Sequence, residues 1–236
     1  MTPNVAGLLL AAGEGSRLGR PKALIMLGGR SLAARGVALL HDGGTTPVVV
    51  VTGAVGAEAV AADLSGATGT GPFGREPADG RLADVRIIDN PRWGSGMGSS
   101  LATGLAALSA AQSGAPPLRA GTSADAGAVV VALADQPLVG PQAVGRLIAA
   151  YHEGASVAVA CYAGKPRNPV LIAREHWPEV IARAEGDVGA RPFLRAHQDL
   201  VRRVECGDTG RPDDVDTPED LELVRRLLAD TATFPA

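Results

Sequence analysis

The residues best suited to chemistry lie near the amino terminus, in a glycine-rich segment that carries two cations. An apolar run of strand length leads into this segment, and Arg17 and Lys22 follow. Backbone N–H groups freed by glycines can surround a phosphate, and cationic side chains can neutralise its charge. The sequence therefore predicts a polyphosphate site. Its expected residues are Leu10, Ala11, Ala12, Gly13, Gly15, Ser16, Arg17 and Lys22.

Two familiar phosphate-binding loops do not fit this segment. A dinucleotide-binding fingerprint needs a third glycine where the chain has Leu18, and a carboxylate after the next strand, where it has Thr52-Gly53. A Walker loop needs its lysine at the start of a helix, but Pro21 precedes Lys22. What remains is a long loop that wraps a free triphosphate, or an ordinary turn with solvated cations.

Two acidic positions far along the chain could complete such a site. Asp135 follows the apolar run 129–134, and Asp216 lies in an acidic stretch just before Thr217. A carboxylate placed where a buried strand surfaces can hold Mg²⁺ against phosphate oxygens. Asp135 could instead cap a turn. Either Asp216 or Thr217 could cap the last helix and leave the other residue free for the metal.

The elements that must position these residues alternate between strands and helices. This alternation predicts an α/β fold with a doubly wound sheet and helices on both faces. A hairpin is expected around the turn 164–168, which would make the C-terminal portion mixed. The strands are expected at 5–10, 48–51, 85–88, 129–133 and 157–160, and the helices at 31–40, 57–64, 98–108, 141–151 and 218–228. Segments 66–81 and 113–127 are expected to be surface loops, because they contain few large apolar side chains.

Composition excludes several classes of function. The 236 residues carry a formal net charge of −3 with no lysine or arginine cluster, which argues against nucleic-acid binding. No apolar stretch approaches the roughly 20 residues that a membrane span needs. Cys161 and Cys206 are far apart and form no metal-binding pattern. We expect a soluble cytoplasmic protein.

Four motifs occur in order: Leu10–Lys22, Asn90–Leu101, Asp135–Pro137 and Asp216–Asp220. Together they resemble the MobA-like nucleotidyltransferases, and most closely the molybdenum cofactor cytidylyltransferase branch. The resemblance runs from Val5 to about Leu228. It implies a Rossmann-like nucleotidyltransferase fold with a mostly parallel sheet, in a single domain over 1–236. Nucleotide binding would fall to residues 1–140 and acceptor binding to residues 141–230.

The resemblance also implies a reaction. CMP would pass from CTP to the phosphate of molybdenum-molybdopterin, a phosphorylated pterin cofactor, with release of pyrophosphate. A phosphate nucleophile is already anionic near neutral pH, so the protein needs only to position it and neutralise charge. Arg17, Lys22 and Asp135 would be catalytic, and Asp135 and Asp216 would hold Mg²⁺, with Mn²⁺ as the alternative. A molybdenum hydroxylase apoenzyme or its maturation chaperone is the expected protein partner.

The choice of base depends mainly on Ala12, because the guanylyl branch of this family has glycine there. The added methyl group disfavours a purine more than a pyrimidine, which favours CTP over GTP. Thr52 and Gly53 are expected to frame the base, and Asn90 to reach the base or ribose. Gly96 and Ser100 complete the expected nucleotide-binding set.

The acceptor is expected to bind Ser99, Asn168 and Arg191. Ser99 could instead cap a helix, and Arg191 could be a solvated surface charge. Relatives have histidine where this chain has Asn168, and asparagine is no acid or base near neutral pH. For Trp93 and Trp177 we favour packing over stacking on a ligand. Other open functions are guanylyl transfer to the same cofactor, transfer to a sugar phosphate or another phosphorylated small molecule, and non-catalytic cofactor delivery.

Overall fold

A seven-stranded sheet forms the centre of the computed structural model, which describes residues 4–66, 84–110 and 126–233. The strand order is β5-β4-β1-β6-β8-β7-β9. Every neighbouring pair is parallel except the two that involve β8, which runs antiparallel to β6 and β7. The strands are β1 (Asn4–Leu10), β4 (Val48–Thr52), β5 (Val85–Asp89), β6 (Ala126–Leu133), β7 (Val157–Tyr162), β8 (Lys165–Ala173) and β9 (Val201–Glu205). A short antiparallel ribbon of β2 (Met26–Leu27) and β3 (Arg30–Ser31) lies outside this sheet.

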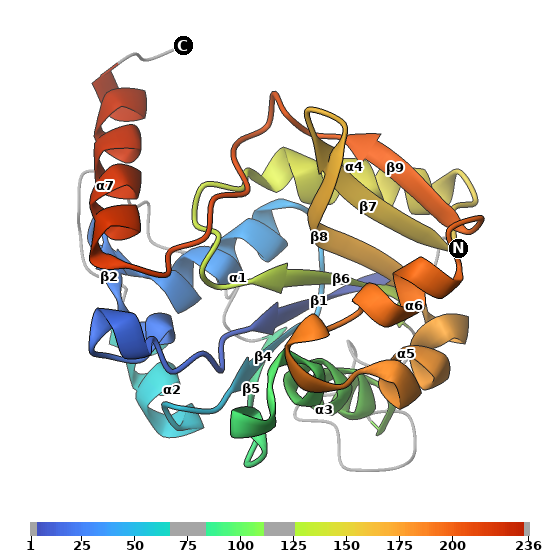
Figure 1. The fold of residues 1–236 in the computed structure, drawn as a ribbon, viewed down its shortest axis with the longest axis horizontal. Coiled ribbons are helices and arrows are strands. Elements are labelled where there is room, and N and C mark those ends of the chain that lie inside the picture. Colours follow the sequence, from blue (N-terminus) through green and yellow to red (C-terminus); the bar gives the residue numbers. More distant parts are fainter. Residues whose placement is uncertain (1–3, 67–83, 111–125, 234–236) are drawn as a thin grey trace.

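Helices cover both faces of the sheet (Figure 1). One face carries α1 (Leu32–Asp42), α2 (Ala57–Gly66) and α4 (Pro141–His152). The other carries α3 (Met97–Ala110), α5 (Trp177–Arg183) and α6 (Arg191–Ala196). A strand covered on both sides must be apolar at every position, which explains the continuous apolar runs in the sequence. The predicted α/β class and mostly parallel sheet are confirmed.

Close packing on both faces uses helix glycines. In β1, Leu9 lies against Gly36 of α1, and Leu8 lies against Gly104 of α3. A Cβ atom at either glycine would come within 2.4 Å of a leucine methyl group. The two helices therefore approach the central strand more closely than alanine would allow.

The chain reverses its direction of travel across the sheet beside β1. It moves from β1 through α1 to β4 and then β5, and it returns to the opposite side of β1 as β6. Ligands of open α/β sheets bind at such a switch point, outside the carboxyl ends of the strands. The glycine-rich segment after β1 and Asp135 after β6 both lie at this edge.

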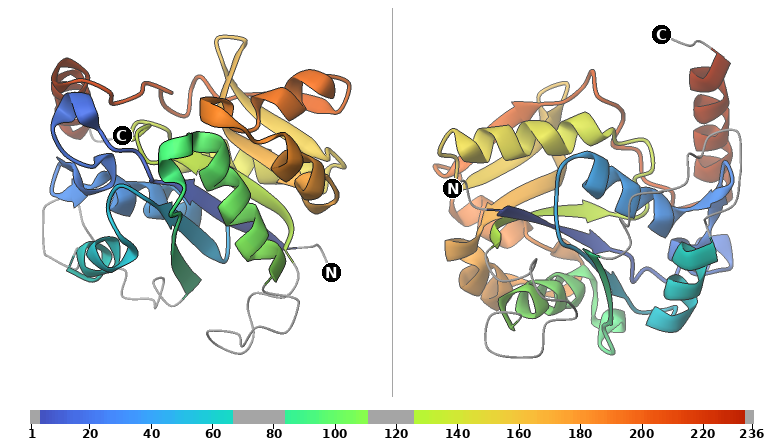
Figure 2. Two further views of the ribbon diagram at one scale, coloured as in Figure 1. Left: turned by 60° about the horizontal axis from the view of Figure 1, so that its bottom comes forward. Right: turned by 180° about the vertical axis from the view of Figure 1, so that it is seen from behind.

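The last helix, α7 (Pro218–Thr233), stands at one edge of the molecule (Figure 2). Leu221 and Val224 on its first turns pack against Ile25 and Leu27, close to β2. This small third core joins α7 to the segment after the glycine-rich loop. Among the described residues, no helix has the length and apolar character to cross a membrane.

Several sequence expectations need correction. The turn of the β7–β8 hairpin is Ala163-Gly164, so most of the expected turn 164–168 belongs to β8. Strand β6 begins at Ala126, inside the expected loop 113–127. The rest of that loop, 113–125, and residues 67–81 of the other lie outside the described residues. The sequence also missed β9, α5 and α6. Strand β9 is short, and two adjacent exposed arginines separate its two half-buried valines, so it gives neither an apolar run nor an alternating pattern.

Two helix glycines give a matched test of this packing. A Cβ atom at Gly98 of α3 would lie 2.6–2.8 Å from backbone atoms of Ala184 and Glu185, whereas one at Gly145 of α4 would make only an ordinary contact. We expect Gly98→Ala to lower the free energy of unfolding by about 1–3 kcal/mol, because backbone must move. Gly145→Ala should raise it by about 0.5–1 kcal/mol, because alanine favours the helix. Urea unfolding measures both, and equal effects would contradict the packing described.

Candidate active site

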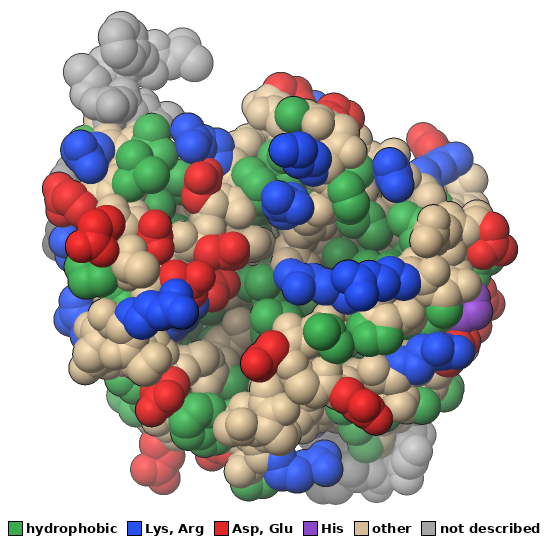
Figure 3. Space-filling model, viewed as in Figure 1, with side chains coloured by type: hydrophobic (Ala, Val, Ile, Leu, Met, Phe, Trp, Pro, Cys, Tyr) green, Lys and Arg blue, Asp and Glu red, His purple; other side chains and the backbone are tan. Residues whose placement is uncertain are grey.

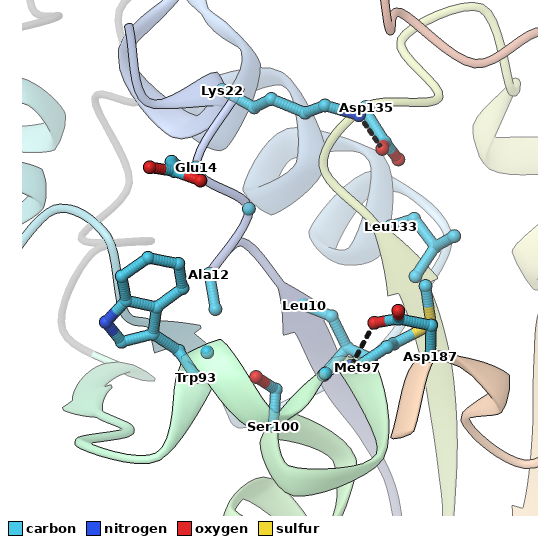
Figure 4. A pocket seen from close by; sticks show the side chains of 13 residues that line it. Leu10, Ala12, Glu14, Lys22, Trp93, Met97, Ser100, Leu133, Asp135 and Asp187 are labelled. Atoms are coloured by element: carbon cyan, nitrogen blue, oxygen red, sulfur yellow. Dashed lines mark hydrogen bonds and ion pairs between the residues drawn. The ribbon is translucent and has the colours of Figure 1, made fainter. Parts of the chain in front are cut away.

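A cavity of about 310 Å³ opens at the carboxyl ends of β1 and β6. Its volume is at the lower end of the range for small-molecule sites, about 300–1,000 Å³. Four segments far apart in the sequence form its walls, as Figure 4 shows. The lining residues are Leu10, Ala12, Gly13, Glu14, Lys22, Trp93, Gly94, Gly96, Met97, Ser100, Leu133, Asp135 and Asp187.

The glycine-rich loop folds back on itself to bring Lys22 to the cavity. The Lys22 backbone N–H donates to the Gly13 carbonyl at 3.2 Å, and Leu18 N–H donates to the Gly15 carbonyl at 2.8 Å. Gly15 has φ 64°, and a Cβ atom there would lie 2.2 Å from the Arg20 carbonyl oxygen. Glycine is therefore required at position 15, because another residue would open the loop and displace Lys22.

The Lys22 ammonium lies between two carboxylates. Its Nζ donates to Asp135 Oδ2 at 2.7 Å and also to Asp216 Oδ1. The exposed fraction of the side chain is 16% for Lys22, 22% for Asp135 and 49% for Asp216, so Asp216 is the most accessible of the three. Burial alone lowers the pKa of Lys22, but the two carboxylates outweigh it and raise that pKa above its ordinary value. Lys22 is therefore a cation throughout the neutral pH range.

The polar side chains at the start of α7 have two separate roles: two of them cap the helix, and one contacts Lys22. Thr217 Oγ1 accepts from the Asp220 N–H at 3.2 Å, and Asp220 Oδ2 accepts from the Thr217 N–H at 2.8 Å. This reciprocal pair caps the start of α7. Thr217 is thus the capping residue, and the side chain of Asp216 is left to face Lys22.

The segment before α7 is fastened to the turn that carries Asp135. The Val215 N–H donates to the Asp135 carbonyl at 2.8 Å, and Gln136 Nε2 donates to Asp214 Oδ1 at 2.8 Å. These bonds fix the two carboxylates relative to each other although 81 positions separate them in the sequence. The positions of the two carboxylates around Lys22 therefore depend on these hydrogen bonds as well as on charge.

Asn90 was expected to reach the base or ribose, but the structure gives it a different position. Asn90 is buried, with 1% of its surface exposed. Its Nδ2 donates to Ser99 Oγ at 2.8 Å and to Ser100 Oγ at 3.0 Å, and its Oδ1 accepts from the Arg92 N–H at 3.0 Å. Asn90 therefore holds the loop between β5 and α3 in shape, and both its Nδ2 and its Oδ1 bond to protein groups.

The remaining expected residues fall into two groups. Leu10, Ala12, Gly13, Gly96 and Ser100 line the cavity together with Lys22 and Asp135. The others lie outside the lining: Ala11, Gly15, Ser16, Arg17, Thr52, Gly53, Ser99, Asn168, Arg191 and Asp216. Thr52 is fully buried, and its hydroxyl donates to Asp89 Oδ1 at 2.6 Å. Arg17 is exposed and forms no ion pair with another described residue.

The expected acceptor residues do not meet in this cavity. The Ser99 hydroxyl donates to the Gly96 and Arg92 carbonyls, at 2.9 and 3.0 Å. Asn168 lies on β8, and Arg191 is exposed at the start of α6. Basic side chains gather over α6 and the β7–β8 hairpin, across a hollow from acidic ones near the start of α7 (Figure 3).

Sequence reasoning missed three polar or aromatic groups of the cavity as site residues: Glu14, Asp187 and Trp93. Asp187 Oδ1 accepts from the Met97 N–H at 3.4 Å, at the first residue of α3. A Cβ atom at Gly96 would lie 2.7 Å from Asp187 Oδ1, so glycine there admits the carboxylate. The sequence marks Asp187 only through the glycine-rich segment 186–191, and this pattern does not predict that the segment lies beside the cavity.

The sheet topology and the switch-point cavity define an α/β protein whose cavity lies at the carboxyl ends of its strands, where open α/β sheets bind their ligands. The chain belongs to the MobA-like NTP transferase domain family, which matches residues 7–201. It is therefore a nucleotidyltransferase, and its family implies a nucleoside triphosphate and a phosphorylated substrate as reactants.

Three curated relatives are similar to the chain. Nicotine blue oxidoreductase of Paenarthrobacter nicotinovorans is 36% identical over 234 residues, which cover 96% of this chain and 97% of that protein. Purine catabolism protein PucB of Bacillus subtilis is 28% identical over 97% of this chain and 99% of its own length. A probable molybdenum cofactor guanylyltransferase of Opitutus terrae is 49% identical over 47 residues, 20% of this chain and 23% of its own.

Solved structures share the fold over nearly the whole chain. The homologue of Mycobacterium tuberculosis Rv0371c from Mycobacterium sp. strain JC1 superposes with a TM-score of 0.67 at 29% identity, covering 97% of both chains. Rv0371c of M. tuberculosis, in a complex with manganese, gives a TM-score of 0.64 at 24% identity. That match covers 96% of this chain and all of the other.

The position of Asn90 can be tested without any ligand. Asn90→Ala removes the described side-chain partner of the Arg92 N–H and of the Ser100 hydroxyl, and one of several partners of the Ser99 hydroxyl. We therefore expect the free energy of unfolding to fall by about 1–3 kcal/mol. Arg17→Ala is the matched control, because its side chain is exposed and forms no ion pair with another described residue, and it should change stability by less than about 0.5 kcal/mol. Urea unfolding in nucleotide-free buffer measures both. If Asn90→Ala instead has unchanged stability but binds nucleotide more weakly, Asn90 contacts the base or ribose directly.

Proposed function

We propose that this protein transfers CMP from CTP to the phosphate of a molybdenum-bearing phosphorylated pterin and releases pyrophosphate. The observation that carries the proposal is the position of Lys22 between Asp135 and Asp216 at the mouth of the switch-point cavity. A cation and paired carboxylates beside a glycine-rich loop suit the neutralisation of a triphosphate. The motif pattern of the sequence and the short match to a molybdenum cofactor guanylyltransferase support the pterin as acceptor.

The donor set suits a divalent cation. Oxygens of Asp135 and Asp216 converge on one point, which the Lys22 ammonium occupies, so both can reach a single cation. Among the described residues, no cluster of three or more metal-binding side chains exists. Mg²⁺ is commonly held by one or two carboxylates together with substrate phosphates, which matches this set. When bound, the metal would neutralise charge at the α-phosphate. Mn²⁺ is the alternative, because a neighbouring structure holds that ion.

The protein's own residues would position and neutralise the triphosphate. Asp135 and Asp216 would exchange the Lys22 ammonium for the metal, and Lys22 would turn toward the α-phosphate. The loop Gly13–Ser16 would present backbone N–H groups to the phosphates, and Arg17 would meet the departing pyrophosphate. Arg17 is exposed and without a described partner, so its side chain is free to do so. A general base is unnecessary, because the attacking phosphate is already ionised.

Specificity for CTP is assigned to Ala12, whose methyl group lies in the cavity wall. It would take space that a purine needs. Gly96 and Ser100 line the same cavity and would contact the base or ribose. Residues 1–140 would form the nucleotide half and 141–230 the acceptor half, with the basic side chains over α6 and the β7–β8 hairpin facing the pterin phosphate (Figure 3).

Oxidoreduction is a second candidate, because the relative that is 36% identical is named nicotine blue oxidoreductase. Leu18 replaces the third glycine of a dinucleotide fingerprint, and β4 ends in Thr52 rather than a carboxylate. These residues favour the nucleotidyltransferase. Consumption of NADH or NADPH with a quinone-like dye, in the absence of any triphosphate, would support the oxidoreductase instead.

Pyrophosphate release tests the proposal directly. With molybdopterin as acceptor and Mg²⁺ present, we expect release from CTP to exceed release from GTP, ATP and UTP. Asp135→Ala should lower turnover by about two to three decades, since it removes one electrostatic contact to the reacting phosphates. Faster release from GTP would overturn the assignment to Ala12. Binding of CTP without any pyrophosphate release would indicate cofactor delivery, and release only with a sugar phosphate would identify another acceptor.

Competition between Lys22 and the metal gives a further test. Lys22→Met removes the positive charge between the carboxylates, so Mn²⁺ should bind at least about tenfold more tightly in the absence of nucleotide. Arg20→Met is the matched control, because it removes a cation of the same loop that has no described contact with the carboxylates. Electron paramagnetic resonance of free Mn²⁺ measures both affinities. Equal binding by Lys22→Met and the unmodified protein would show that the metal binds elsewhere.

A further inference from the structure

The two tryptophans of the chain have different environments. Trp177 is 1% exposed, and its Nε1 donates to the Ile172 carbonyl at 3.1 Å. Trp93 is only half-buried, and its side chain lines the cavity. Its indole forms no hydrogen bond with another described residue, although its backbone N–H donates to the Asn90 carbonyl at 3.1 Å. Packing accounts for Trp177, whereas it leaves much of the Trp93 ring without a role.

The base of the Trp93 side chain packs closely against the wall that carries Ala12. A Cβ atom at Gly53 would lie 2.4 Å from Trp93 Cβ, 2.6 Å from Trp93 Cγ and 2.9 Å from Ala12 Cβ. Glycine at position 53 therefore admits both side chains at once. This arrangement explains why Gly53, expected to frame the base directly, lies behind the cavity wall.

Trp93 also lies on a firmly held loop. Asn90 bonds both to the Arg92 N–H and to the serines that begin α3. Ser95 Oγ donates to the Arg92 carbonyl at 2.7 Å, and the Gly96 N–H donates to the Trp93 carbonyl at 3.0 Å. The backbone that carries the indole is thus fixed before any ligand arrives, which reduces the entropy that binding costs.

We propose that the Trp93 indole is the stacking surface for the base of the bound nucleoside triphosphate. The inference rests on the proposed function and names the residue that binds the base. In Figure 4 the indole lies beside Ala12, across the cavity from Leu133 and Asp187 and away from the Lys22–Asp135 pair. With the triphosphate at Lys22, the base reaches the Trp93 end of the cavity. Base stacking on an aromatic ring is favourable and tolerant of base identity, so Trp93 supplies affinity while Ala12 restricts size.

Nucleotide titrations of three proteins test this inference: the unmodified protein, Trp93→Phe and Trp93→Ala. CTP with Mg²⁺ should quench tryptophan fluorescence in the unmodified protein but not in Trp93→Phe, where only the buried Trp177 remains. Calorimetry should show about 10- to 100-fold weaker CTP binding by Trp93→Ala, and binding by Trp93→Phe within about threefold of the unmodified protein. Inorganic tripolyphosphate with Mg²⁺ has no base, so all three proteins should bind it equally.

Two outcomes would overturn the inference. One is equal CTP affinity in Trp93→Ala and the unmodified protein. The other is a parallel loss of tripolyphosphate binding in Trp93→Ala, which would mean that the indole only supports the loop. These titrations contain no acceptor and measure no turnover. A protein that stacks CTP on Trp93 yet releases no pyrophosphate would refute the proposed reaction alone, and one that releases pyrophosphate with Trp93 irrelevant would refute this inference alone.

Discussion

The contact of Lys22 with two carboxylates is the interaction on which the rest of the site depends. It joins residues that lie 113 and 194 positions apart in the sequence. Asp135 and Asp216 have like charges and would repel each other if no cation lay between them. The ammonium therefore holds in place the loop after β1, the turn after β6 and the segment before α7. Surface ion pairs contribute little to stability, but these groups are partly buried and also fastened by the Val215 and Gln136 hydrogen bonds.

The cavity is shaped largely by the absence of side chains. Gly53 admits Trp93 beside Ala12, Gly96 admits Asp187, and Gly98 lets the backbone at Ala184 approach α3. At each place a methyl group would meet atoms less than 3 Å away. The residues of the site thus form two shells: an inner shell that lines the cavity, and an outer shell that holds the inner residues in position. Thr52 and Asn90 belong to the outer shell, where their polar groups are satisfied by protein.

The sequence predicted those features that local pattern determines. Continuous apolar runs correspond to β1, β4, β5 and β6. The helix expected at 31–40 corresponds to α1, which Ser31 caps by accepting from the Ala34 N–H. The family followed from four motifs, and the domain match confirms it. Features that depend on which distant segments touch were not predictable in this way. The sequence could not tell an asparagine that contacts a ligand from one that bonds Ser99 and Ser100, nor indicate that Asp187 returns to the cavity from the other half of the chain.

The separation between Lys22 and Asp216 also bears on how the protein is made. Synthesis proceeds from the amino terminus, and a domain folds as its chain becomes available. All seven strands of the sheet are complete once Glu205 has been added, but the second carboxylate comes 11 residues later. A chain interrupted between these points has every strand of the sheet and only one of the two carboxylates. Cleavage by a protease just before Asp216 would likewise leave every strand of the sheet, but it would remove the second carboxylate and the α7 residues that pack against Ile25 and Leu27.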